Sequence, residues 1–556
     1  MLKTAVNKIL GQRDPRINDW ASILKGARSW SDALTKNATG PKVLVATNIT
    51  GIAGASILES MLAVALTLRS ARVEVVVCDK ALPACQLAHL GGGTTAETLV
   101  KRELPDGSCR ICEHVGKGNF EGLGLTIHKL SQLITEDERK SAEMLASSIP
   151  IEEIRSYKAE GMVVGEHAYA GALRFYARGS LDGEPEGELI LRRYFEASLL
   201  TAYAFNRLIH EGGYDVACFH HGIYVPQGIV GEVCRKYGVR VVNWNPSYRT
   251  NTFIFSHGDT YHHTLLDEPA SEWEGMPWDE KKEKEIMDYL KSRWQGTGDW
   301  IWFHEKPDED FGKYVKEAGI DLSKPLIGML SNVIWDAQLH YPANAFPDIL
   351  AWVRETIKYF ERRPYLQLLI RIHPAEIRGT LPSRQALYDE IVKMFPRLTG
   401  NVFVIKPESP VSTYTVLEAC DSAIIYGTKM GVELTSMGIP VVVAGEAWIR
   451  NKGITMDASS AEEYFALLDR LPIGKRLDKE IVQRARKYAY HFFFRRMIPL
   501  PFMMEHKKPG FTLNIASLNE IFPERYPGLD VICDGIMKGT PFVYPAERYG
   551  IQGKYP

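Results

Sequence analysis

Short apolar runs that alternate with helical stretches restrict the fold of this chain more than any other feature of its sequence. Residues 42–47 and 73–78 form nearly continuous apolar runs, separated by a glycine-containing turn and a helical stretch. Apolar runs of this length are typical of parallel strands that helices cover on both faces. The order strand, helix, strand therefore predicts a right-handed βαβ unit.

The same alternation returns twice further along the chain. Apolar runs at 214–219 and 239–243 flank a helical stretch, and a longer series of strands and helices runs from Lys324 to Ala444. A chain of 556 residues is also too long for a single hydrophobic core. We therefore predict an α/β protein with two Rossmann-like domains, parallel sheets and a C-terminal helical extension.

Changes in this pattern predict the domain boundaries. Residues 271–310 are rich in Glu, Lys, Asp and Trp but poor in strand-like runs, so we place the connection between the domains there. We expect a helical extension at 1–40, a first Rossmann-like domain with insertions at 41–310, a second at 311–475, and an extension at 476–556 that packs back on the first domain.

Composition excludes several classes of protein. Hydrophobic residues make up 45% and charged residues 24%, which is ordinary for a globular protein, and the net charge is only −2. A nucleic-acid partner would favour a strong basic excess, so none is expected. No apolar run reaches the length of a membrane span, and the N-terminus lacks the pattern of a secretory signal. We expect a cytoplasmic protein.

A basic and aromatic segment, 484–502, has two interpretations. Three consecutive phenylalanines, Phe492, Phe493 and Phe494, stand beside Arg495 and Arg496. The segment either packs against the first domain or contacts the inner face of the membrane peripherally, where aromatic and basic side chains suit anionic headgroups. We favour packing.

Eight cysteines are too few for a disulfide scaffold in a chain of this size. Cys109 and Cys112 form a C-x-x-C pair, and with Cys85 and His114 they could supply four ligands to a structural zinc ion. A single C-x-x-C pair favours the simpler interpretation, in which these residues are buried thiols near a loop. No other metal site is expected.

Polar loops follow the predicted strands of the second half. In a parallel sheet the carboxyl ends of the strands meet at one edge, where backbone N–H groups favour a bound anion. We expect this edge to hold the phosphate of a nucleotide. The candidate residues are Ser331, Asn332, Arg371, His373, Glu376, Ser412, Thr413, Gly427, Thr428, Lys429 and Glu433.

Three of these candidates carry specific expectations. Arg371 and His373 share a strand face and could donate to a phosphate, and Glu433 could bind a sugar or ribose diol. The simpler alternatives are that His373 is a hydrogen-bonded structural residue, and that Glu433 caps its own helix.

Polar residues also follow the strands of the first half. Asn48, Gly51 and Gly54 lie in the turn after the first strand, where a ligand could approach the backbone, and His220 lies at a later strand end. The turn lacks the G-x-G-x-x-G pattern of dinucleotide-binding proteins, so no dinucleotide cofactor is expected. These four residues are the candidates for the acceptor side of the site.

The segments RIHPAE (371–376) and YGTKMGVELTSMGIPVVVAG (426–445), supported by the HHG turn at 220–222, resemble the bacterial capsule polysaccharide biosynthesis family of GT-B-type glycosyltransferases. The resemblance implies two facing domains. It implies a nucleotide-sugar donor bound by the second domain through His373 and Glu433, and a saccharide or glycolipid acceptor bound by the first. It also implies that neither a metal ion nor a cofactor is required.

In the reaction that this resemblance implies, His221 or Asp259 would accept the proton of the acceptor hydroxyl. Two other functions remain open. A nucleotide-sugar epimerase or hydrolase would use the same donor site without an acceptor. A noncatalytic scaffold of an envelope polysaccharide assembly complex would keep the fold and bind no nucleotide.

Overall fold

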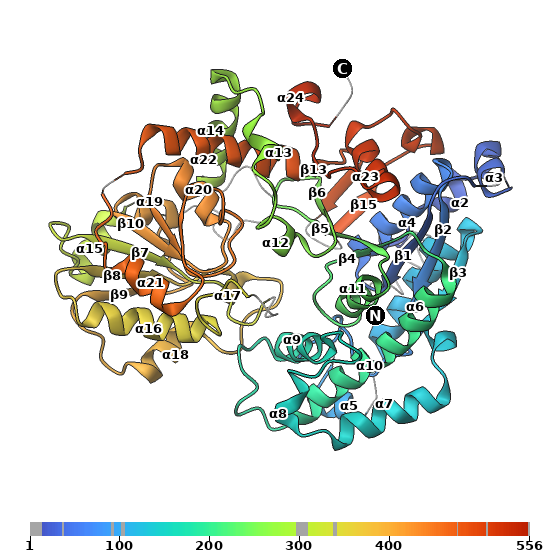
Figure 1. Ribbon diagram of the computed structural model, residues 1–556, viewed down its shortest axis with the longest axis horizontal. Helices are drawn as coiled ribbons and strands as arrows, with labels where there is room; N and C mark the ends of the chain where they lie inside the picture. Colours follow the sequence, from blue (N-terminus) through green and yellow to red (C-terminus); the bar gives the residue numbers. More distant parts are fainter. Residues whose placement is uncertain are drawn as a thin grey trace. The chain divides into compact units, whose positions relative to one another are not determined.

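A computed structural model gives the structure of the chain (Figure 1). It describes residues 14–35, 38–90, 94–101, 106–295, 308, 310–336, 342–474, 476–506 and 510–553. The predicted extension at 1–40 and the predicted connection at 271–310 therefore lie partly outside the described residues. None of the described helices is both long and apolar enough to cross a bilayer.

The chain divides into two compact units. Unit 1 contains 1–176, 180–261 and 494–556, and unit 2 contains 177–179 and 262–493. Unit 2 thus begins before the boundary that we predicted at 310. The reason is that α13 (Ser271–Glu274) and α14 (Glu280–Trp294) pack against α22 (Lys479–Tyr490), which belongs to unit 2.

Unit 1 is built on a seven-stranded sheet with the order β13-β6-β5-β4-β1-β2-β3 (Figure 1). The five strands from β5 to β3 are parallel, and β6 is antiparallel to both of its neighbours. The strands are β1 (Lys42–Asn48), β2 (Arg72–Val77), β3 (Thr126–Lys129), β4 (Val216–His220), β5 (Arg240–Pro246), β6 (Thr252–His257) and β13 (Ile498–Pro499). A separate hairpin consists of β14 (Met503–His506) and β15 (Gly510–Leu513).

Helices cover both faces of this sheet because nearly every residue of its central strands is apolar. One face packs on α4 (Ala53–Leu68), whose middle turns are buried, and on α23 (Pro527–Lys538). The other face packs on α9 (Val164–Tyr176), α10 (Gly187–Gly212) and α11 (Gln227–Lys236). The remaining helices are α2 (Trp20–Ile23), α3 (Arg28–Thr35), α5 (Ala96–Val100), α6 (Asp106–Phe120), α7 (Glu136–Ser148), α8 (Ile151–Ile154), α24 (Ala546–Tyr549), and the short 3-10 helices 121–123, 130–133 and 518–521.

Unit 2 is built on a six-stranded, fully parallel sheet with the order β12-β11-β10-β7-β8-β9. Leu330 pairs with both Arg371 and Ile425, so β7, β8 and β10 end at the same level. The strands are β7 (Leu326–Leu330), β8 (Gln367–Arg371), β9 (Val402–Ile405), β10 (Ser422–Ile425), β11 (Val441–Val443) and β12 (Met456–Asp457). The helices are α12 (Tyr261–Thr264), α13, α14, α15 (Phe311–Ala318), α16 (Ile349–Glu361), α17 (Ala375–Arg378), α18 (Leu387–Met394), α19 (Thr413–Glu418), α20 (Met430–Ser436), α21 (Ala461–Leu468) and α22. A π-helical turn at 491–496 begins in unit 2 and ends in unit 1.

The predicted fold class is confirmed, because each unit is a Rossmann-like α/β layer structure with a mostly parallel sheet. The C-terminal extension differs in detail from the prediction. It is not only helical, because it contributes β13 to the sheet of unit 1 and forms the hairpin of β14 and β15.

The basic and aromatic segment is packed inside the protein. Phe492, Phe493 and Phe494 are all buried, and Phe492 stacks on Trp448. The guanidinium of Arg496 donates to backbone carbonyls of Phe255 and Phe542 within unit 1. The alternative of a peripheral membrane contact therefore loses its apolar anchors, and packing is the interpretation that the structure supports.

Candidate functional site

Ser331 and Asn332, which follow β7, join the loops at the carboxyl ends of three strands in unit 2. The Ser331 hydroxyl accepts a hydrogen bond from the backbone N–H of His373 at 3.0 Å, after β8. The Asn332 side-chain oxygen accepts from the backbone N–H of Gly427 at 3.3 Å, after β10. The structure thus brings these four predicted residues together at one edge of the sheet.

His373 is a neutral hydrogen-bond donor at this edge. Its Nδ1 accepts the backbone N–H of Ala375 at 3.0 Å, so the ring proton resides on Nε2. Burial, together with the positive charges of Lys429 and Arg371, lowers the pKa of His373 to about 4. At neutral pH the ring can therefore donate from Nε2 without carrying a charge.

Arg371 is used to hold the loop after β9. It is 2% exposed and donates to the carbonyls of Lys406 at 2.5 Å and Ser409 at 3.2 Å, and to the Thr413 hydroxyl at 3.3 Å. Burial lowers its pKa to about 10. The prediction that Arg371 donates directly to a phosphate needs correction, because its side chain is directed into this loop.

Ser412 and Thr413 also have structural roles. The Ser412 hydroxyl caps α19 by accepting the backbone N–H of Thr415 at 3.4 Å, and Thr413 bonds Arg371. Their side chains therefore stabilise the loop and helix instead of standing open to a ligand.

Glu376 caps a helix. Both of its carboxyl oxygens lie 3.3 Å from the backbone N–H of Leu387, the first residue of α18, and the side chain is buried. Burial raises the pKa of Glu376 to about 7. This residue is committed to α18, which corrects its assignment to the donor-binding set.

Glu433 lies in a buried charge cluster. Its carboxylate accepts from the Tyr414 hydroxyl at 2.6 Å and from Lys429 Nζ at 2.8 Å, and it lies 3.3 Å from a guanidinium nitrogen of Arg293. Burial opposes its charge, but Arg293 and Lys429 outweigh this and lower the pKa to about 2. Glu433 neither caps α20 nor offers its carboxylate to a sugar diol.

Lys429 connects this cluster to the edge of the sheet. Burial and the charge of Arg293 lower its pKa to about 8, while Glu433 acts in the opposite direction. The same ammonium group is close enough to His373 to lower the pKa of the imidazole. Lys429 and His373 therefore supply a cation and a neutral donor to the same edge of the sheet. We did not predict from the sequence that Arg293 belongs to this cluster, because its helix, α14, comes much earlier in the chain.

The two glycines of the turn after β10 differ in their surroundings. A Cβ at Gly427 would be in ordinary contact at 3.9 Å, whereas one at Gly431 would lie only 2.7 Å from Ile425 and Ile449. Gly431 thus serves packing. Thr428 is buried, and its hydroxyl accepts the backbone N–H of Met430 at 3.3 Å.

The loop after β11 adds residues that the sequence patterns did not indicate. The Glu446 carboxylate accepts the backbone N–H of Ala343 at 2.9 Å, and Asn344 accepts the backbone N–H of Glu446 at 2.9 Å. His263 Nε2 lies 3.7 Å from the second carboxylate oxygen of Glu446. No recognisable motif surrounds these residues, so only the fold reveals that they share the edge.

In unit 1, the predicted glycines serve packing. A Cβ on Gly51 would lie 2.8 Å from Cys112 Sγ and from the Leu87 side chain, and one on Gly54 would lie 2.9 Å from Phe511. Both positions need the absence of a side chain for close contact inside the unit. This corrects the expectation that they admit a ligand.

Two residues at the strand ends of unit 1 have left-handed backbones. Asn48 has φ 50° at the end of β1, and His221 has φ 67° directly after β4. Such conformations in residues other than glycine concentrate at functional sites. His220 is 8% exposed and packs on Trp244, and burial lowers its pKa to about 4.

Asp259 lies in the loop that follows β6. The next residue, Thr260, is close to the turn after β4, because a Cβ at Gly222 would lie 3.2 Å from its side chain. The Asp259 side chain is 39% exposed, accepts the backbone N–H of Thr260 at 2.6 Å and lies 3.8 Å from Arg235. The assignment of Asp259 as the catalytic base therefore stays a prediction.

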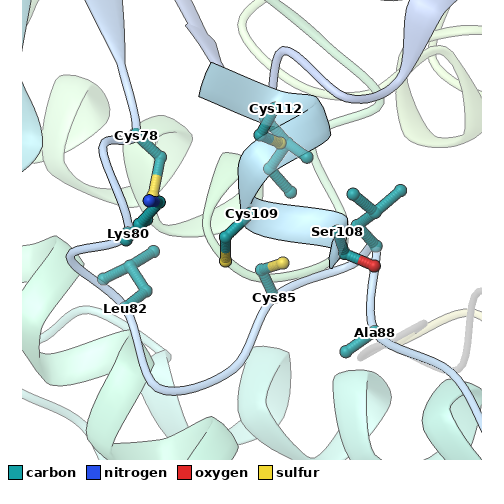
Figure 2. Close-up of a pocket in the computed structure, with 10 residues that line it drawn as sticks. Cys78, Lys80, Leu82, Cys85, Ala88, Ser108, Cys109 and Cys112 are labelled. Carbon is teal, nitrogen blue, oxygen red and sulfur yellow. The ribbon is translucent and has the colours of Figure 1, made fainter. Parts of the chain in front are cut away.

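Four thiols line a pocket in unit 1, and Figure 2 shows Cys78, Cys85, Cys109 and Cys112 around it. Burial raises the pKa of Cys78 to about 12 and also raises those of Cys85 and Cys112. His114 does not line the pocket and lies 3.4 Å from Asp14. Within the described ranges, no three Cys, His, Asp or Glu residues are arranged to hold a metal ion. The favoured interpretation of buried thiols therefore agrees with these surroundings, and the structural zinc ion stays an untested alternative.

Comparisons with known proteins give no family. No family model matches the chain, and no curated protein matches it. Among solved structures, it is similar to the Thermosulfurimonas dismutans KpsC beta Kdo 2,4 transferase, with 13% identity over 50% of this chain and 79% of that one and a TM-score of 0.32. It is also similar to a putative UDP-N-acetylglucosamine 2-epimerase from Listeria monocytogenes, with 12% identity over 81% and 91% of the chains and a TM-score of 0.23. Likenesses this low do not identify the chain.

Proposed function

We propose that this protein is a glycosyltransferase that moves a sugar from a nucleotide-sugar donor to a saccharide or glycolipid acceptor of a surface polysaccharide. The observation that carries the proposal is that a cation, Lys429, and a neutral donor, His373, follow β10 and β8 where these strands end at the same level as β7. A cation and an uncharged donor at the carboxyl edge of a parallel sheet suit a phosphate group.

The chemistry follows from these two groups. As the bond from the anomeric carbon to the phosphate oxygen breaks, negative charge develops on that oxygen. Lys429 stabilises this charge and His373 donates from Nε2, and both are held in place before the reaction. Arg371 and Glu433 act indirectly, because Arg371 fixes the loop after β9 and Glu433 orients Lys429.

A thermal-shift screen with CMP, UDP, GDP and ADP tests the donor site. A bound nucleotide stabilises the folded state by mass action, by about 2.7 kcal/mol at a concentration of 100 times Kd. We expect one nucleotide to raise the melting temperature clearly above the others. His373→Ala should remove most of that shift, because the variant lacks the Nε2 donor.

Glu376→Gln is the matched control, since it changes a buried polar residue of the same strand-end segment that bonds α18. It should keep the nucleotide shift. Equal, negligible shifts with all four nucleotides would contradict the donor site and favour a noncatalytic scaffold. Turnover of a nucleotide sugar without any acceptor would favour an epimerase or hydrolase instead.

A further inference from the structure

A buried carboxyl group lies beneath the strand ends of unit 1. Val45 of β1 pairs with Cys218 of β4, and His220 pairs with Trp244 of β5. Because side chains alternate along a strand and His220 pairs with Trp244, these two side chains point to the same face of the sheet. The Thr47 hydroxyl of β1 approaches the carboxyl group from the same side. Helix α4 covers that face and places Glu59 against them.

Glu59 is fully buried and accepts the indole N–H of Trp244 at 2.9 Å. In the part of the chain that the structure describes, no lysine or arginine forms an ion pair with it. The Thr47 hydroxyl and the backbone N–H of His220 approach the carboxyl group and favour its charged form, but burial dominates and raises the pKa of Glu59 to about 7.

Several polar atoms around Glu59 are buried without a hydrogen-bond partner of standard geometry among the described residues. They are Glu59 Oε2, Thr47 Oγ1 and His220 Nδ1. A carboxyl group in such a place destabilises the fold, and a glutamine would keep the bond from Trp244 without an ionisable group. A buried carboxyl next to the strained backbones of Asn48 and His221 therefore indicates a role in function.

We propose that Glu59 is a positioning residue that prepares His220 to accept the proton of the acceptor hydroxyl. This role rests on the glycosyltransferase function proposed above. The acceptor O–H bond breaks, and its proton goes to a ring nitrogen of His220. The acceptor oxygen bonds the anomeric carbon as the bond to the phosphate oxygen breaks. The Glu59 carboxylate stabilises the imidazolium that forms, and it holds Trp244 beside the ring.

The pH dependence of the activity should report the ionisation of Glu59, because of the groups that face it. His220 and Cys218 face it from β4, Thr47 from β1 and Trp244 from β5. Burial raises the pKa of Cys218 well above its usual value, and the charges of Glu59 and of Cys533 in α23 act in the same direction. The charge of Arg174 adds to burial in lowering the pKa of His220. Of these groups, Glu59 is the one whose pKa lies near 7, so activity should rise with pH through about 7.

The test compares Glu59→Gln with Glu505→Gln over a range of pH. Glu505 is the matched control, because burial also raises its pKa to about 7 in unit 1, where it accepts the backbone N–H of Asn251. We expect Glu59→Gln to lower kcat by ~100-fold, to leave the KM for the donor unchanged and to lose the rise near pH 7. Glu505→Gln should keep the wild-type kcat, the wild-type KM for the donor and the rise in activity near pH 7. Trp244→Phe should move the rise to higher pH, since the carboxylate loses a donor.

A readout that needs no activity separates the two proposals. Infrared difference spectra of the wild type against Glu59→Gln should show a protonated carboxyl group that titrates near pH 7. If this carboxyl group titrates in the wild type but Glu59→Gln transfers sugar with a normal kcat and pH profile, the positioning role is wrong and the proposed function stands. If the wild type shows the titration but transfers no sugar, the proposed function fails and this role fails with it.

Discussion

Burial sets the ionisation of the polar side chains at the carboxyl edge of the unit 2 sheet. It keeps His373 neutral, and it brings the pKa of Lys429 down to about 8. Glu433 stays charged despite burial because Arg293 and Lys429 lie beside it. The edge therefore presents net positive charge together with a neutral donor, which is the electrostatic basis for binding an anion.

Glu376 gives a pH-dependent effect on stability at the residue scale. Its folded pKa of about 7 exceeds the usual value of 4.5, so between these values the folded state binds more protons than the unfolded state. Its contribution to stability is then present at low pH and is lost as pH rises through about 7. We expect Glu376→Gln to exceed the wild type in stability at pH 8 by up to about 3 kcal/mol.

The measurement is urea unfolding of both proteins at pH 5 and pH 8. The advantage of Glu376→Gln should shrink at pH 5, where most of the wild-type carboxyl is protonated in the folded state. An advantage that stays constant between the two pH values would show that Glu376 is ionised like an exposed carboxyl.

At the scale of elements, sequence patterns predicted the strands well because an apolar run is a local signal. The runs 42–47 and 73–78 correspond to β1 and β2 within one residue at either end. The roles of polar side chains could not be predicted equally well. Arg371 and Glu433 are bonded by groups from other elements, and no local spacing reveals that Arg293 of α14 lies beside Glu433.

Arg293 links α14 to α20 and provides a test at this scale. Its side chain is buried, and it lies 3.3 Å from Glu433. Arg293→Met removes one cation from a buried cluster and leaves Glu433 with Lys429, so we expect a loss of about 3 kcal/mol in the free energy of unfolding. Urea denaturation of the wild type and the variant at neutral pH measures this difference in the free energy of unfolding.

Arg293→Lys is the control, because it keeps the positive charge but lacks the planar guanidinium group. It should lose less stability than Arg293→Met. Equal stability of the wild type and Arg293→Met would mean that the ion pair makes no net contribution and that packing alone joins α14 to α20.

At the scale of the whole molecule, the two units differ in how the chain builds them. Unit 1 takes three separate stretches, and its last stretch supplies β13 and α23, whereas unit 2 is nearly one continuous stretch from His262 to Phe493. The carboxyl edges of the two sheets also differ in chemistry. The edge of the unit 2 sheet carries Lys429 and His373, and the edge of the unit 1 sheet carries His220 above the buried Glu59.

This difference predicts where a nucleotide protects the backbone against hydrogen exchange. If the phosphate binds beside Lys429 and His373, the favoured nucleotide should slow exchange in the loops after β7, β8 and β10, since binding lowers the population of locally open states. Exchange in β1, β4 and α4 of unit 1 should change less with the nucleotide alone. His373→Ala should abolish the protection in unit 2 at the same nucleotide concentration. Protection confined to unit 1 would place the nucleotide on the other sheet and would reverse the assignment of donor and acceptor sides.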